Sequence, residues 1–337
     1  MLQLVAWCVA VVPKTITLNN GVEMPTILYG SGGAVTQDNV SATATAVAIA
    51  VSSAVGFPGL DCANNYHNQV GVAQGIANSS TSRKDLWLQT KLPPCGHSNI
   101  RNGHCFEDSL RVFNENLQQL STDYVDLTLI HAPPCVPNST WADPACVWVD
   151  PYDEDHYPQN CNCAATTPCQ MMRDQWRALE QRLAEGKTRA IGVSNFCVPC
   201  LECLAGASST VPAVNQLQFH AGMAGGDDPK GLFSYCKAKG IQPQAYSPLG
   251  GEQAATVLES PVLHAVGAAH NKSTAKVALQ WVLKLGYALT TASFSEAHMK
   301  DDLDLFEWEM TAEEVASVTK VGAIAPDDPT KTMCLYK

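Results

Sequence analysis

The sequence predicts an α/β fold, a single (β/α)8 TIM barrel with an N-terminal β-hairpin plug and long loops at its C-terminal face. Apolar strand-like runs alternate with helix-like segments from residue 27 to about residue 289, as parallel β/α units require. Eight such runs occur, and no linker or further repeat indicates a second domain. The length of 337 residues agrees, because α/β barrels often reach this size as one domain.

The predicted elements follow in order along the chain. Residues 15–24, TITLNNGVEM, predict a two-stranded hairpin that turns at Asn20-Gly21 and closes the bottom of the barrel. The expected barrel strands are 27–30, 58–61, 86–90, 125–131, 189–194, 213–219, 242–247 and 287–292. Helix candidates between them include 40–55, 106–119, 171–185 and 274–285, whose apolar residues recur every three or four positions. An apolar segment, 1–14, precedes the domain at 15–323, and a tail, 324–337, follows it.

One irregular stretch stands out within the domain, the cysteine-rich residues 132–168. Its position after a barrel strand puts it at the catalytic face, and loops of this length are usually functional, so we expect a substrate lid. Trp141, Trp148 and Tyr152 are candidates for an aromatic wall around the substrate. Anchoring of the lid to the barrel by these aromatics is an equally good interpretation.

Composition limits the possible partners. Hydrophobic residues make up 46% and charged residues 16% of the chain, which indicates a folded globule. The net charge of −11 disfavours nucleic acid and anionic membranes as partners. The apolar run at residues 2–12 is too short to span a bilayer. We therefore expect no nucleic-acid partner and no membrane span. A monomer is also expected.

Cysteines and sequons bear on the compartment. Fourteen cysteines are many for a reducing environment, and Asn-x-Ser/Thr sequons begin at Asn39, Asn78, Asn138 and Asn271. The apolar start resembles the core of a secretory signal, although no basic residues precede it. These features modestly favour a secreted, disulfide-bonded glycoprotein, and a cytosolic enzyme with free thiols is the alternative.

The cysteine pattern also raises the question of a metal. Cys197, Cys200 and Cys203 recur every third residue, but no fourth ligand has zinc spacing, so no metal site is predicted. Disulfides within the lid, or between the lid and the loop that holds Cys95 and Cys105, are favoured instead. Their connectivity cannot be derived from the sequence.

Four polar residues of different chemistry follow or end predicted strands: Asp61, Tyr66, Lys91 and His131. The carboxyl ends of parallel barrel strands meet at one mouth, where a carboxylate, a phenol, an amine and an imidazole would converge. A substrate carbonyl at this mouth would have a proton donor beside it. Taken singly, each of these residues is more often structural than catalytic.

Seven segments carry a resemblance to the aldo-keto reductases over roughly residues 15–323: TLNNGVEMP, GFPGLDCANNYHN, LWLQTKL, STDYVDLTLIH, LAEGKTRAIGVSNF, PAVNQLQFH and AYSPLG. The resemblance implies a small-molecule substrate, an aldehyde or ketone that is reduced to an alcohol by hydride from NAD(P)H. Tyr66 is then the proton donor, Lys91 makes its proton easier to release, and Asp61 holds Lys91. His131 is expected to hydrogen-bond the substrate carbonyl.

The resemblance also implies the cofactor contacts. Ser194, Asn195 and Gln216 correspond to residues that bind the nicotinamide carboxamide, and Tyr246 to the aromatic that stacks on the ring. The remaining expected cofactor residues are Gly30, Ser31, Gly32, Ser247, Leu249, Ser293, His298 and Asp302. No GxGxxG follows a first strand, which argues against a Rossmann domain.

The chain departs from the family where two cations usually hold the 2′-phosphate of NADPH. Ala292 stands in place of a lysine and His298 in place of an arginine. Charge-assisted hydrogen bonds of this kind are worth about 1.5 to 3 kcal/mol each. NADPH is expected first, with NADH a close alternative. A nucleotide-binding regulatory or interaction protein with little turnover is the alternative function.

Overall fold

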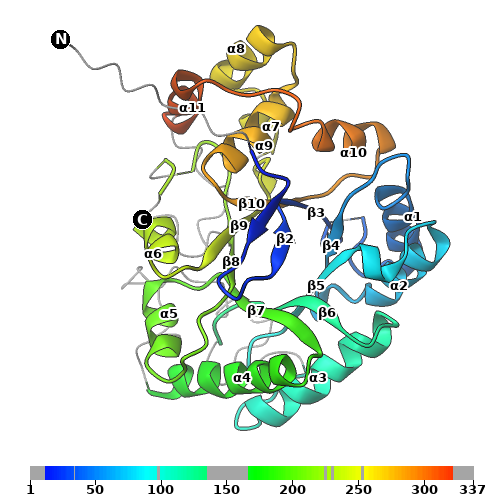
Figure 1. The fold of residues 1–337 in the computed structure, drawn as a ribbon, viewed down its shortest axis with the longest axis vertical. Helices are drawn as coiled ribbons and strands as arrows, with labels where there is room; N and C mark the ends of the chain where they lie inside the picture. The colour runs from blue at the N-terminus through cyan, green and yellow to red at the C-terminus, as the bar shows by residue number, and fades with distance from the viewer. Residues whose placement is uncertain are drawn as a thin grey trace.

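The computed structural model describes residues 12–33, 35–96, 99–134, 166–223, 226–228, 231–251 and 254–321. Eight parallel strands close into a barrel in the order β10-β3-β4-β5-β6-β7-β8-β9, with helices around it (Figure 1). The strands are β3 Ile27–Gly30, β4 Gly59–Asp61, β5 Trp87–Leu92, β6 Val125–Ile130, β7 Thr188–Ser194, β8 Val214–Gln218, β9 Gln242–Tyr246 and β10 Ala288–Thr291. The predicted (β/α)8 architecture is confirmed, with strand ends that differ by one or two residues.

The helices are α1 Val40–Ala50, α2 Gln69–Asn78, α3 Cys105–Gln119, α4 Thr166–Ala184, α5 Val198–Ala205, α6 Leu232–Ala238, α7 Ala254–Leu258, α8 Pro261–His270, α9 Thr274–Lys284, α10 Glu296–Leu303 and α11 Ala312–Thr319. Two 3-10 turns, η1 Asn64–Tyr66 and η2 Arg83–Asp85, join them.

Two predicted helix boundaries were wrong. The helix expected at 40–55 ends at Ala50, because the chain turns back through Gly56, whose φ of +90° suits glycine, and the Phe57 amide donates to the Ala50 carbonyl. Helix α4 begins at Thr166, so the expected irregular stretch ends before residue 166. Pro168 is compatible with this start, because the first turn of a helix does not need its backbone N–H.

The predicted hairpin is present and lies over the barrel strands in Figure 1. Strands β1 Thr15–Thr17 and β2 Glu23–Pro25 pair antiparallel. Its buried Leu18 and Met24 belong to one apolar cluster with barrel residues such as Leu28 and Leu127. The Asn19 side chain donates to the Pro212 carbonyl across 3.0 Å. The hairpin therefore closes the barrel end that lies opposite the catalytic mouth.

Disulfides tie together the loops and helices. Cys95 pairs with Cys105, and Cys169 on α4 pairs with Cys203 on α5. The suggested bridge from the lid to the 95–105 loop is wrong, because the two cysteines of that loop bond to each other. Cys197 and Cys200 are also disulfide-bonded. Within the described ranges, no group of three metal-ligating side chains occurs.

The lid candidates Trp141, Trp148 and Tyr152 lie outside the described residues. In the part of the chain that the structure describes, no helix has the length and apolar character needed to cross a bilayer.

Candidate active site

The four polar residues expected at the mouth come together there. Asp61 ends β4, Lys91 lies near the end of β5, and His131 directly follows β6. Tyr66 ends the 3-10 turn after β4. The Lys91 Nζ lies 2.6 Å from Asp61 Oδ1 and 3.3 Å from the Tyr66 hydroxyl. The Tyr66 and His131 rings meet edge to face with centroids 5.5 Å apart.

Burial makes the charges of this cluster interdependent. The Lys91 side chain is inaccessible to solvent. Desolvation alone lowers the pKa of Lys91, but Asp61 and Tyr66 raise it further than burial lowers it, so the amine stays protonated. Burial raises the pKa of Tyr66, and Lys91 acts in the opposite direction. The phenol therefore holds its proton at neutral pH next to a cation that stabilises the phenolate.

His131 is a buried imidazole beside Tyr66 at the barrel mouth. Burial, followed by the Lys91 charge, holds its pKa well below the usual value, so the ring is neutral. Its Nδ1 lies 2.7 Å from Asn65 Oδ1, an oxygen that can only accept. An acceptor at this distance favours the tautomer with the hydrogen on Nδ1. Asn65 was not predicted as a site residue, although its position next to Tyr66 in the sequence could have indicated it.

Three buried glutamines surround Asp61. Gln89 donates from Nε2 to Asp61 Oδ1 across 2.9 Å, and Gln216 donates to Asp61 Oδ2 across 3.0 Å. The Oε1 of Gln244 accepts from both glutamines, each at 2.9 Å. Gln89 and Gln244 were missed. Each precedes an expected site residue, Lys91 or Tyr246, by two positions, and this spacing places it on the same inward face of its strand.

The residues expected around the nicotinamide form one hydrogen-bonded group. The Ser194 hydroxyl donates to the Gln216 carbonyl, and the Asn195 amide donates to Ser194 Oγ and to the His131 carbonyl, all at 3.0 Å. The Tyr246 hydroxyl donates to Asn195 Oδ1 across 3.1 Å. The group lies beside the catalytic cluster because β7, β8 and β9 are adjacent strands.

The loop after β9 has left-handed backbone at several positions. Ser247, Gly250 and Gly251 all have positive φ, and Leu249 lies among them. Left-handed backbone can turn N–H groups toward a bound anion such as a pyrophosphate, and the Gly250 N–H donates instead to the Ser247 carbonyl. The residues present at this end of the barrel thus fit a nicotinamide dinucleotide.

The backbone at Gly30 and Gly32 lies close to neighbouring side chains, as expected for these positions. A Cβ on Gly32 would lie 2.6 Å from the Tyr66 ring, and one on Gly30 would lie 2.8 Å from Thr290 Oγ1. Ser31 points inward, and its hydroxyl donates to the Asp61 carbonyl. These positions therefore support Tyr66 and Asp61 directly.

The surroundings of α10 are rich in carboxylates. His298 is exposed, and the Ser293 hydroxyl accepts from the Ser295 amide. Asp302 is buried and accepts from Thr291 Oγ1 across 3.0 Å. Burial raises the pKa of Asp302 to about 6.

The lysines of this region are already paired. Lys300 lies 2.6 Å from Glu296, and Lys276 lies 2.7 Å from both Asp301 and Asp304. A phosphate dianion placed here would have to compete with these carboxylates for the cations.

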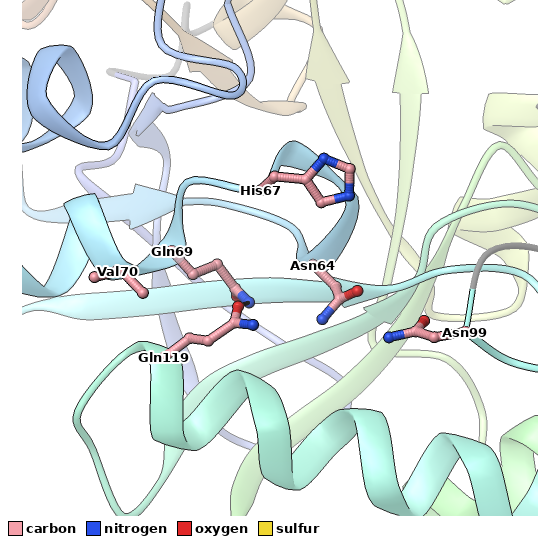
Figure 2. A pocket seen from close by; sticks show the side chains of 6 residues that line it. All are labelled: Asn64, His67, Gln69, Val70, Asn99 and Gln119. Carbon is pink, nitrogen blue, oxygen red and sulfur yellow. Dashed lines mark hydrogen bonds between the residues drawn. The ribbon is translucent and has the colours of Figure 1, made fainter.

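A separate polar pocket of about 340 Å³ lies between η1, α2 and α3 (Figure 2). Its lining residues are Asn64, His67, Gln69, Val70, Asn99 and Gln119. Its carboxamides are largely bonded to one another. Asn116 Oδ1 accepts from both Asn64 and Gln69, and Gln119 Oε1 accepts from Gln69 across 2.9 Å. Asp61, Tyr66, Lys91 and His131 do not line it among the described residues.

Comparison with known proteins agrees with this geometry. The aldo/keto reductase family model matches residues 26–323. The chain is 33% identical over 314 residues to the glyoxal reductase of Bacillus subtilis, covering 93% of this chain and 94% of that protein. It is 31% identical to the morphine 6-dehydrogenase of Pseudomonas putida, covering 93% of each chain.

Solved structures show the same fold. A Bombyx mori aldo-keto reductase in complex with NADP superposes with a TM-score of 0.73 at 25% identity, covering 96% of this chain and 99% of that chain. A Brucella melitensis aldo/keto reductase gives a TM-score of 0.72 at 29% identity, covering 92% and 99% respectively. On its sequence, its barrel and the residues at the barrel mouth, the chain belongs to the aldo/keto reductase family.

Proposed function

We propose that this chain reduces an aldehyde or ketone to an alcohol, with hydride from NAD(P)H and a proton from Tyr66. The observation that carries the proposal is Lys91 Nζ held between the Asp61 carboxylate and the Tyr66 hydroxyl. A bound nicotinamide would supply the hydride. Tyr66 gives its proton to the carbonyl oxygen as negative charge develops there, and Lys91 stabilises the resulting phenolate.

The residues of the nicotinamide group have a positioning role in this proposal. Asn195 and Gln216 present amide groups to the carboxamide, and Tyr246 covers one ring face, so that the hydride faces the substrate carbonyl. Asp61 supplies the counter-charge for the buried Lys91, because an unpaired buried cation would cost free energy.

The test follows loss of NAD(P)H absorbance with an aldehyde. Glyoxal is a reasonable first substrate, because one relative is named glyoxal reductase, and an aromatic aldehyde provides a bulkier comparison. We expect wild-type turnover and a loss of at least about 100-fold in Tyr66→Phe, in line with the usual contribution of a general acid. Unchanged turnover in Tyr66→Phe would refute the assignment of the acid.

Nucleotide binding without turnover is the alternative function. It predicts tight binding of NAD(P)H by titration with no reduction of any aldehyde or ketone in a panel. The assembled Asp61, Lys91 and Tyr66 cluster favours catalysis, because a binding module has no need of a polarised phenol.

For the cofactor, we propose NADPH, on the basis of the family, and we propose that NADH is accepted nearly as well. The ion pairs of Lys276 and Lys300, together with Ala292 and His298, support weak selection for the 2′-phosphate. We expect the kcat/KM values for the two cofactors to differ by less than about tenfold, which corresponds to 1.4 kcal/mol. The double substitution Ala292→Lys/His298→Arg should then raise selectivity for NADPH. A strong NADPH preference in the wild-type enzyme would contradict the proposal.

We also propose a monomer that acts in an oxidising compartment. The Cys95–Cys105 and Cys169–Cys203 bridges support this, and the sequon residues Asn39, Asn78 and Asn271 are exposed. Thiol counting on denatured protein from the native source is the measurement for the compartment. Fourteen reactive thiols would contradict it. Light scattering during size-exclusion chromatography measures the oligomeric state.

A further inference from the structure

The glutamines around Asp61 are unusually deep for neutral polar side chains. Gln89 and Gln244 are completely buried, and Gln216 is 2% exposed. Two of their polar atoms, Gln89 Oε1 and Gln244 Nε2, have no hydrogen-bond partner among the described residues. Buried amides with unsatisfied atoms are costly, so apolar residues would serve stability better at these positions. Their presence suggests a role in the active site.

Gln244 is hydrogen-bonded to both neighbouring glutamine amides. Its Oε1 accepts one N–H from Gln89 and one from Gln216. Each of these two glutamines also donates to the Asp61 carboxylate, to a different oxygen. With the N–H groups of Gln216 directed to Asp61 and Gln244, its Oε1 is the atom left for the cofactor. That oxygen matches the NH2 of a nicotinamide carboxamide, which can only donate.

We propose that Gln244 is a positioning residue that couples the cofactor-binding amide of Gln216 to the Asp61–Lys91 ion pair. This inference rests on the proposed function. Gln244 touches neither Lys91 nor Tyr66 through a hydrogen bond that the structure describes. It acts by holding Gln216 in the orientation that offers an acceptor to the nicotinamide.

Gln89 has a narrower role in the same network. It donates to Asp61 Oδ1, the oxygen that also accepts from Lys91. The negative charge of Asp61 raises the pKa of Tyr66. An amide N–H on the carboxylate stabilises that charge and weakens its effect, so loss of Gln89 should make Tyr66 a weaker acid. Gln89 makes no hydrogen bond to Gln216 in the described structure, so cofactor affinity should be unaffected.

The experiment compares Gln244→Met with Gln89→Met, since methionine keeps the length of the side chain and removes its polar atoms. Gln242→Met is the matched control. It lies on the same strand, and its amide donates to the Pro243 and Gly286 carbonyls. Three quantities are measured for each variant: the Kd for NAD(P)H by fluorescence titration, kcat for reduction, and the pH profile of alcohol oxidation, which reports Tyr66 as the base.

Gln244→Met and Gln89→Met should change different measured quantities. For Gln244→Met we expect the cofactor Kd to rise about tenfold, as for loss of one well-oriented hydrogen bond. For Gln89→Met we expect a Kd within about twofold of wild type and a pH profile displaced upward by about half a unit or more. Gln242→Met should resemble wild type in all three measurements.

An unchanged cofactor Kd in folded Gln244→Met would overturn the inference. Equal effects of Gln244→Met and Gln89→Met on Kd would also overturn it, because they would indicate general loosening of the barrel. If Gln244→Met does not fold, Gln244→Asn is used, which keeps an amide but withdraws it from Gln216, and the same Kd criterion applies. Failure of the proposed function is distinct, because the wild-type protein would then bind no nucleotide or reduce no carbonyl.

Discussion

Gly32→Ala should impair catalysis with little effect on stability. The added Cβ would lie 2.6 Å from Cε2 and Cζ of Tyr66 and 2.9 Å from its hydroxyl. Ordinary contact begins at 3.4 Å, so the ring must move by about 0.8 Å. A displacement of about 1 Å in a catalytic group costs on the order of 10²-fold in rate. The 3.3 Å hydrogen bond from Lys91 to Tyr66 would lengthen at the same time.

The assay is steady-state reduction of an aldehyde, together with urea denaturation. We expect kcat to fall by about 30- to 100-fold. The free energy of unfolding should change by less than about 1 kcal/mol, because the partly exposed Tyr66 ring can shift without opening a core cavity. Gly33→Ala is the control, since its nearest contact would be Thr36 Oγ1 at 3.6 Å. A Gly32→Ala enzyme with full kcat would refute the reasoning.

Three further predictions concern stability and the imidazole. Replacing the Cys169–Cys203 bridge, which spans 34 residues, by two alanines should lower the free energy of unfolding by about 4 kcal/mol in urea, and a loss below about 1 kcal/mol would contradict the chain-entropy argument. The carboxyl of Asp302 has a pKa raised to about 6, so the free energy of unfolding should fall as the pH rises from about 4 to 6. Asp302→Asn should remove this pH dependence and add up to about 3 kcal/mol to the free energy of unfolding at pH 8. If the free energy of unfolding depends on pH in the same way in Asp302→Asn and wild type, the carboxyl of Asp302 is not protonated in the folded state. In Asn65→Val, loss of the acceptor should change the ratio of the Nδ1–H to the Nε2–H tautomer of His131 by about fivefold toward Nε2–H, as measured by histidine ring 15N shifts. An unaltered tautomer ratio would show that Asn65 does not control the tautomer.

Much of the active site was predictable because it depends on strand ends. Asp61 and Lys91 end or nearly end their strands, and the parallel order of a barrel brings such positions to one mouth. The helix ends were less predictable. The segment after Ala50 keeps an apolar pattern, but the turn at Gly56 ends the helix earlier. The start of α4 at Thr166 was hidden by the proline and threonines at its beginning.

Amide orientation and partner choice were not predictable from the sequence. Gln89 and Gln244 occur in apolar strands, and the sequence does not indicate which atoms will hydrogen-bond to their side chains. The pairing of Cys95 with Cys105 was one of many possible connectivities. The Nδ1 of His131 bonds to Asn65, a residue 66 positions away in the chain.

The sequence by itself determined the barrel, the hairpin plug and the identities of the groups at the mouth, because periodicity and strand ends are local properties. Only the tertiary structure decided which atoms those groups use. Lys91 binds both Asp61 and Tyr66, Gln244 accepts from two amides, and Asn65 bonds to Nδ1 of His131. Each of these depends on hydrogen-bond geometry between residues on different elements, which exists only after the barrel has closed.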